Sequence, residues 1–206
     1  YSTGSYGGRL LRVSDRRLGS VDYGAELGAL NFSLNGYATT RIALDDYPAG
    51  GSGVALARAD MVSAMGAGQS LTAFLGHSSP SSWARESLLT AAQVSSGLLA
   101  NSTRPTVAWV LGCYGGYAVD PVYNNVAPAL MVQPGGSGAV AVMGTSALTS
   151  TASDVAWMNA VRPYLTTERL GDALMQAQRR LHEHGSLYED AVGSAMLLGD
   201  PAMRLR

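Results

Sequence analysis

The chain has 206 residues, a charged fraction of 14%, a formal net charge of -1 and a single cysteine. This length suits one domain whose core is large enough without disulfides or a metal. The charge gives no basic surface for a nucleic acid, and no run of about 18 apolar residues is present to span a membrane. We therefore expect residues 1–206 to form one domain. The loose Tyr/Ser/Gly start without an initiator Met makes it a candidate fragment of a longer precursor.

Short apolar, β-rich runs alternate with segments of helical periodicity along the chain, which is typical of a parallel sheet covered by helices on both faces. The predicted strands run from Leu10 to Val13, Arg41 to Leu44, Leu71 to Leu75, Val107 to Leu111, Ala139 to Met143 and Ala202 to Leu205. The predicted helices run from Tyr23 to Leu34, Ala55 to Met65, Arg85 to Gln93, Val122 to Met131, Ala152 to Tyr164 and Glu168 to His184. The fold class is therefore α/β, with a mostly parallel six-stranded sheet between two helical layers.

Three reactive side chains follow predicted strands: Asp15 after the first, His77 after the third and Cys113 after the fourth. Ligand sites in open parallel sheets form beyond the carboxyl ends of the strands, and the third and fourth strands are neighbours in a sequential sheet. A thiolate is a nucleophile and a nearby imidazole can take its proton, so Cys113 and His77 suffice for acyl transfer. Asp15 is a candidate to orient the imidazole. The backbone N–H groups of Cys113 and Ser78 are candidates to hold an oxyanion.

Each of these residues also has a purely structural interpretation. A lone cysteine is most often a small buried residue, His77 fits a hydrogen-bonded histidine at a strand end, and Asp15 fits a turn or helix cap. Ser78 lies in a stretch similar to a serine-hydrolase elbow, but Pro80 replaces the closing glycine, so it is a weak nucleophile candidate.

Several motifs occur in a fixed order along nearly the whole chain. They are Phe-Leu-Gly-His-Ser-Ser at 74–79 followed by Trp83, Arg104-Pro105 before a strand that ends in Gly112-Cys113, Gly-Ala-Val-Ala-Val at 138–142 with Thr145-Ser146 after it, and Leu-Gly-Asp-Pro-Ala-Met-Arg-Leu at 198–205. In this order the motifs resemble the gingipains and their relatives. These cysteine peptidases share the caspase-like three-layer sandwich with caspases, legumain and clostripain.

The resemblance implies that Cys113 attacks the peptide carbonyl, His77 transfers the proton and Asp15 is the third catalytic residue. In arginine-specific relatives an acid in the helix after the first strand lines the primary specificity pocket, and Asp22 is the nearest match, with Glu26 as its rival. The resemblance thus favours cleavage after a basic residue. It also implies a second pocket wall in the loop from Thr145 to Thr151, where Ser146 and Thr151 are the candidate substrate contacts.

Further expectations come from the same resemblance. Relatives usually have Gly-His-Gly where this chain has Gly76-His77-Ser78, a difference in the oxyanion loop. Relatives are generally secreted and supported by calcium, so a secreted or cell-envelope location is favoured over a cytoplasmic one. No calcium ligand set can be identified, and we expect no other cofactor. The expected partners are a protein or peptide substrate and an N-terminal pro-segment or subdomain of the same precursor.

Three functions are compatible with this sequence. The first is an active cysteine endopeptidase, favoured because both His77 and Cys113 are retained. The second is a catalytically silent caspase-like module for binding or scaffolding. The third is a regulated intracellular protease that activates one partner by a single cut.

Overall fold

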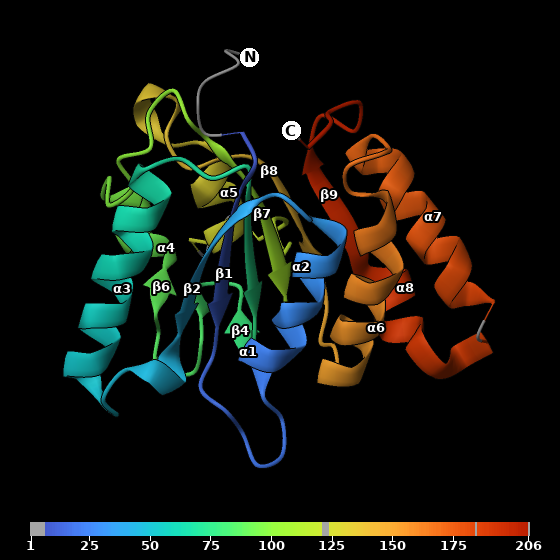
Figure 1. Ribbon diagram of the computed structural model, residues 1–206, viewed down its shortest axis with the longest axis horizontal. Helices are drawn as coiled ribbons and strands as arrows, with labels where there is room; N and C mark the ends of the chain where they lie inside the picture. Colours follow the sequence, from blue (N-terminus) through green and yellow to red (C-terminus); the bar gives the residue numbers. More distant parts are fainter. Residues whose placement is uncertain (1–6, 121–123, 184, 206) are drawn as a thin grey trace.

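The computed structural model describes residues 7–120, 124–183 and 185–205. Its main sheet has the strand order β2-β1-β3-β7-β8-β9, and all neighbouring pairs are parallel except β8 with β9 (Figure 1). The strands are β1 (Arg9–Ser14), β2 (Ala38–Ala43), β3 (Leu71–Leu75), β7 (Thr106–Leu111), β8 (Ala139–Thr145) and β9 (Ala195–Gly199). The sequence therefore predicted the fold class correctly, including the pairing of its third and fourth strands.

Helices cover both faces of this sheet and form the outer two layers (Figure 1). One face carries α1 (Tyr23–Glu26), η1 (Leu27–Ala29), α2 (Leu30–Ser33), α6 (Thr151–Val161), η4 (Arg162–Tyr164), α7 (Leu170–His182), η5 (Gly185–Tyr188) and α8 (Glu189–Ser194). The other face carries η2 (Leu44–Asp46), α3 (Gly51–Gly66), α4 (Ala91–Ser95) and α5 (Val126–Met131), and η3 (Pro134–Gly136) precedes β8. No helix within the described ranges is long and apolar enough to cross a lipid bilayer.

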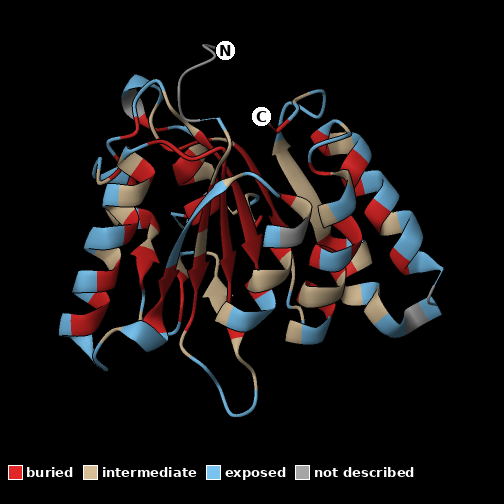
Figure 2. Cartoon of the chain, viewed as in Figure 1, coloured by how far each residue is buried: buried red, intermediate tan, exposed pale blue. Residues whose placement is uncertain are grey.

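The two faces of the sheet bury separate apolar clusters, because successive side chains of a strand point to opposite faces. In β3, Leu71, Ala73 and Leu75 belong to the cluster under α6 and α7, whereas Phe74 belongs to the cluster under α3 and α5. The central strands β3 and β7 are buried along their whole length and are red in the centre of Figure 2, as expected for strands that are covered on both sides. This double burial fixes the strand register and so the positions of the residues at the strand ends.

A small antiparallel sheet follows β3 and was not predicted. It consists of β4 (Ser78–Ser79), β5 (Ser82–Trp83) and β6 (Leu89–Thr90). Trp83 is fully buried and stacks on Phe74 of β3, with ring centroids 5.2 Å apart. The backbone N–H of Ala84 donates to the carbonyl of His77 at 2.8 Å. The small sheet therefore holds the segment after β3 against the main sheet.

The predicted strand from Ala202 to Leu205 is wrong. The sixth strand is β9, an apolar run just before it, and it pairs antiparallel with β8. After Gly199 the chain turns: Asp200 accepts backbone hydrogen bonds from Ala202, through its side chain, and from Met203, through its carbonyl. The carbonyl groups of Pro201 and Met203 accept the N–H groups of Gly171 and Leu170 in the first turn of α7. This segment therefore caps the start of that helix.

The predicted helix from Arg85 to Gln93 is also wrong over most of its length. Ser87 has a positive φ of 57°, which interrupts a helix, and a capping box formed by Thr90 and Gln93 begins the short α4 only at Ala91. The predicted helix from Tyr23 to Leu34 is three short helical segments in succession, α1, η1 and α2. The first two residues of the helix predicted from Val122 lie outside the described residues.

Candidate active site

The strand register brings the two reactive residues to the same edge of the sheet. Leu75 of β3 lies opposite Leu111 of β7, so His77 and Cys113 each lie two residues beyond a matched pair. Ser14 of β1 also lies opposite Leu75, which puts Asp15 on the other side of His77. All three residues predicted from the sequence therefore meet at the carboxyl edge.

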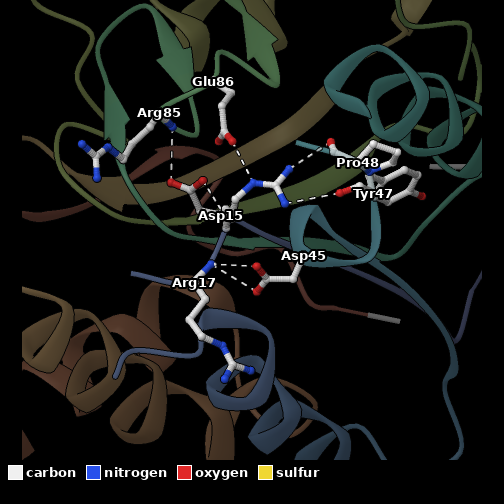
Figure 3. Close-up of polar contacts among 8 residues, drawn as sticks. Asp15, Arg17, Asp45, Tyr47, Pro48, Arg85 and Glu86 are labelled. Atoms are coloured by element: carbon white, nitrogen blue, oxygen red, sulfur yellow. Dashed lines mark hydrogen bonds and ion pairs between the residues drawn. The ribbon is translucent and has the colours of Figure 1, made fainter. Parts of the chain in front are cut away.

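Asp15 is buried, at 1% exposure, and binds backbone groups (Figure 3). Its Oδ2 accepts the N–H of His77 at 3.0 Å and that of Arg85 at 3.3 Å, and its Oδ1 accepts the N–H of Arg16 at 2.7 Å. Burial raises the pKa of Asp15 and Glu86 adds to the shift, while the three N–H groups oppose it. No described hydrogen bond joins this carboxylate to the imidazole, so Asp15 holds the main chain of the His77 loop.

The residue after Asp15 extends this network to two other loops. The Arg16 guanidinium forms an ion pair with Glu86 at 2.9 Å and donates to the carbonyl groups of Tyr47 and Pro48, each at 3.3 Å (Figure 3). The N–H of Arg17 is bound by the carboxylate of Asp45. The loop after β1 is therefore fixed to the loops after β2 and β5.

Cys113 lies in a tight turn directly after β7. Tyr114 has a φ of 59°, in the left-handed region that is uncommon for residues with a side chain, and such strain is concentrated at functional sites. The Cys113 sulfur donates to the Thr149 carbonyl at 3.3 Å, and the Thr149 N–H lies 3.5 Å from it. Among the described hydrogen bonds, none uses the Cys113 backbone N–H. This N–H can therefore serve a ligand.

Glycine is required just before the cysteine because β3 and β7 converge there. A Cβ at Gly112 would lie 2.3 Å from the carbonyl oxygen of Gly76 and 2.6 Å from the hydroxyl of Ser78. A Cβ at Gly76 would lie 2.2 Å from the Cβ of Asp15. The glycine before each reactive residue thus permits the close approach of the loops.

The imidazole of His77 contacts Tyr23, a residue that the sequence analysis did not select. The Tyr23 hydroxyl lies 3.3 Å from Nε2, and the two rings pack edge to face with centroids 6.0 Å apart. Tyr23 is only 2% exposed and begins α1, directly after the helix-capping residue Asp22. The available signal was the predicted helix start at Tyr23, because this helix follows the first strand and begins at the edge of the sheet where a site is expected.

The predicted pocket residues lie in different surroundings. Asp22 accepts the N–H of Ala25 at 2.9 Å and forms an ion pair with Arg17 at the surface. Glu26, its rival, is exposed in the same turn. Ser146 donates its N–H to the Ser194 carbonyl at 2.9 Å, which ties it to α8. Thr151 begins α6, and its side chain interacts with the Tyr23 phenol.

A second buried carboxyl group lies near this edge, in the first turn of α6. Asp154 is 3% exposed and its Oδ1 has no hydrogen-bond partner among the described residues. Burial raises the pKa of Asp154 to about 7, and repulsion from Asp190 adds to the shift. Within the part of the chain that the structure describes, no three acidic, histidine or cysteine side chains cluster to hold a metal ion.

Comparisons with known proteins agree with this geometry. A model of peptidase family C25 matches residues 3–206, so the chain belongs to this family, the gingipain-type cysteine peptidases. The structure is similar to that of the Arg-specific cysteine proteinase gingipain R (RgpB), with a TM-score of 0.78 and 20% identity over 98% of this chain. This chain covers 48% of that one.

Two further structures share the fold. A complex of the pro- and mature domains of Porphyromonas gingivalis RgpB gives a TM-score of 0.77 at 20% identity, and a structure described only as a protease gives 0.73 at 15% identity. Each match covers 98% of this chain and 49% of the other. The chain thus has the caspase-like fold of the gingipains and spans about half the length of these relatives. A search of curated proteins gives no significant match.

Proposed function

We propose that this chain is a cysteine endopeptidase in which Cys113 is the nucleophile and His77 the general acid and base. The observation that carries this proposal is the register of β3 and β7, which puts an imidazole and the single thiol of the chain at equivalent positions on adjacent strands. Membership in a family of cysteine peptidases supports the same chemistry. A catalytically silent binding module would not require a thiol and an imidazole at these two positions.

The reaction follows the usual course of thiol acyl transfer. His77 takes the proton of the Cys113 thiol, and the thiolate attacks the carbonyl carbon of the scissile peptide bond to form a tetrahedral adduct. As the C–N bond breaks, His77 gives the proton to the leaving amine, and a thioester remains on Cys113. His77 then takes a proton from water, the hydroxide attacks the thioester, and the thiol and the carboxylic acid product are released.

The negative charge of the adduct requires hydrogen-bond donors. The Cys113 N–H has no partner among the described hydrogen bonds and is proposed as one donor. The Ser78 N–H is proposed as the other, because Ser78 is bound to Cys113 through its side chain at 2.7 Å. In this interpretation the serine in place of the usual glycine connects the two halves of the oxyanion site.

The substrate is proposed to be a protein or peptide with a basic residue, preferably arginine, before the cleaved bond. The Arg-specific gingipain among the similar structures supports this preference. Asp22 is the proposed acid of the pocket, with the loop that carries Ser146 and Thr151 as the opposite wall. In the structure Arg17 already forms an ion pair with Asp22, so a substrate arginine has to displace it.

The setting of the enzyme is proposed from its family. We expect a secreted or cell-envelope protein that acts without a cofactor and that meets a pro-segment or subdomain of the same precursor. The RgpB complex of pro- and mature domains supports such a partner. No step of the mechanism depends on calcium.

Labelling with an arginyl chloromethyl ketone, followed by mass spectrometry of the peptides, tests this function. We expect stoichiometric alkylation of Cys113 in the wild type, slower alkylation in His77→Ala, and faster reaction than with a norleucyl chloromethyl ketone of similar length. Cys113→Ala should abolish peptide hydrolysis while its urea unfolding curve stays that of the wild type. Hydrolysis by Cys113→Ala would refute the mechanism. A wild type that neither hydrolyses peptides nor reacts with either ketone would favour the silent module.

A further inference from the structure

We propose that Tyr23 is a positioning residue whose phenol oxygen accepts the Nε2–H of His77 and leaves Nδ1 as the nitrogen that serves the Cys113 thiol. This inference rests on the proposed function, because a catalytic imidazole needs its proton and its lone pair on the correct nitrogens. It assigns to Tyr23 the orientation of the imidazole, for which Asp15 was the candidate from the sequence.

Asp15 binds backbone N–H groups, so another residue has to orient the imidazole. Its two carboxylate oxygens accept three backbone N–H groups, from Arg16, His77 and Arg85. The imidazole has one described hydrogen-bond contact, between its Nε2 and the Tyr23 hydroxyl at 3.3 Å. The two tasks of a third catalytic residue are therefore divided: Asp15 holds the main chain of the loop, and Tyr23 holds the ring.

The surroundings of Tyr23 fix its position. Its ring belongs to the apolar cluster that also contains Leu27, Leu30 and Leu75, and the edge-to-face packing against His77 sets the angle between the two rings at 74°. Asp22 caps the helix that begins at Tyr23, which fixes the backbone. A buried aromatic ring with one hydroxyl at its tip is well suited to orient a neighbour, because few of its torsions are free.

The role of a base sets the direction of the hydrogen bond. The Tyr23 phenol occupies Nε2, so Nδ1 is the nitrogen left for the Cys113 thiol. A base needs a lone pair on that nitrogen to take the thiol proton. The proton of the neutral imidazole is then on Nε2, and the phenol oxygen accepts it.

The alternative is that Tyr23 only fills the core. Tyr23→Phe distinguishes a positioning role from a packing role, because it keeps the ring and removes the hydroxyl. Tyr47→Phe is the matched control, since it removes another phenol hydrogen bond, 2.7 Å long, from Tyr47 to Asp60. Both variants are first compared with the wild type by urea unfolding.

The test uses the full chain labelled with 15N-histidine and long-range proton–nitrogen NMR at pH 8. The chain has three histidines, and the signals that disappear in His77→Gln identify His77. We expect the Nε2–H tautomer in the wild type and in Tyr47→Phe, and a mixture of tautomers in Tyr23→Phe. We also expect kcat for peptide hydrolysis to fall about tenfold in Tyr23→Phe, with KM within about twofold and an altered pH profile. Tyr47→Phe should keep wild-type kinetics.

The Nδ1–H tautomer in the wild type would overturn the proposal, even if Tyr23→Phe does not fold. An unchanged tautomer and kcat in a folded Tyr23→Phe would also overturn it. If the wild type hydrolyses no peptide, the proposed function fails, and the tautomer still decides whether Tyr23 orients the ring.

Discussion

The hydroxyl of Ser78 donates a hydrogen bond of 2.7 Å to the backbone carbonyl of Cys113. This bond connects the loop after β3 to the loop after β7 at the point where both carry a reactive residue. A glycine at position 78, as in the usual Gly-His-Gly pattern, could not form it. The serine therefore adds a cross-link between the two loops.

Removal of this hydroxyl should loosen the site more than the fold. Ser78→Ala is expected to lower the free energy of unfolding by about 1 kcal/mol and to slow alkylation of Cys113 severalfold. Ser81→Ala is the control, since its hydroxyl lies at the exposed end of the same hairpin. Urea unfolding and the rate of iodoacetamide labelling measure the two effects, and equal labelling rates in both variants would contradict the expectation.

Asp15→Asn should affect the backbone around His77. An amide presents one acceptor oxygen where the carboxylate presents two, so at least one of the three bound N–H groups loses its partner. We expect a loss of about 2 kcal/mol in the free energy of unfolding and faster hydrogen exchange in peptides covering residues 76–86. Asp46→Asn, which alters only an exposed ion pair with Arg41, should leave that exchange unchanged.

Asp154 should make the protein less stable as the pH rises. Its pKa is raised from 3.8 to about 7 in the fold, so the folded state binds the proton more tightly than the unfolded chain does. The contribution to stability is complete below about pH 4 and is lost as the pH rises through about 7. At about 1.4 kcal/mol per unit of pKa shift, this shift corresponds to a change of about 4 kcal/mol in the free energy of unfolding.

Asp154→Asn removes this titration, so it should unfold at higher urea concentration than the wild type at pH 8, with a smaller difference at pH 5. The pH dependence that Asp190 adds to the stability has the opposite sign. Burial would raise the pKa of Asp190, but hydrogen bonds from Ser153 and Ser150 lower it, so its contribution is lost as the pH falls. Urea curves of Asp154→Asn and Asp190→Asn across this pH range provide the check, and parallel curves for Asp154→Asn and the wild type would disprove the assignment.

Arg17→Ala should improve the hydrolysis of arginine substrates. The Arg17 and Asp22 side chains are 57% and 34% exposed, so a substrate guanidinium can compete with Arg17 for the carboxylate. We expect KM for an arginyl peptide to fall about threefold, and Asp22→Asn to cancel the gain in the double variant. Arg41→Ala breaks a comparable exposed pair with Asp46 and serves as the control. No change in KM would remove Asp22 from the pocket.

The sequence predicted the layers of the fold because the central strands β3, β7 and β8 are apolar runs that are buried on both faces. It failed near the C-terminus, where Ala195–Gly199 and Ala202 to Leu205 are similar short apolar runs and only the pairing with β8 distinguishes them. It also failed after His77. There the helical pattern from Arg85 is overridden by a positive φ at Ser87 and by the buried Trp83, both tertiary effects.

The candidate site was predictable as far as strand ends determine it. Asp15, His77 and Cys113 follow strands, and the register of neighbouring strands brings them together. Tyr23 and Thr149 belong to loops and helix starts whose positions depend on side-chain packing. Periodicity carries no information on which atoms of such residues reach the imidazole or the sulfur.

The loops of the candidate site follow four different strands of the sheet, at residues 15–23, 77–78, 113 and 149–151. Contacts between such distant parts of a chain form late, because each requires the closure of a long loop. A ribosome-bound chain that has emerged only as far as Cys113 lacks the Thr149 carbonyl and α6, both of which belong to the site. The contacts of the thiol with Thr149 therefore form only after β8 has been synthesised, so the proposed peptidase site is incomplete in a nascent chain.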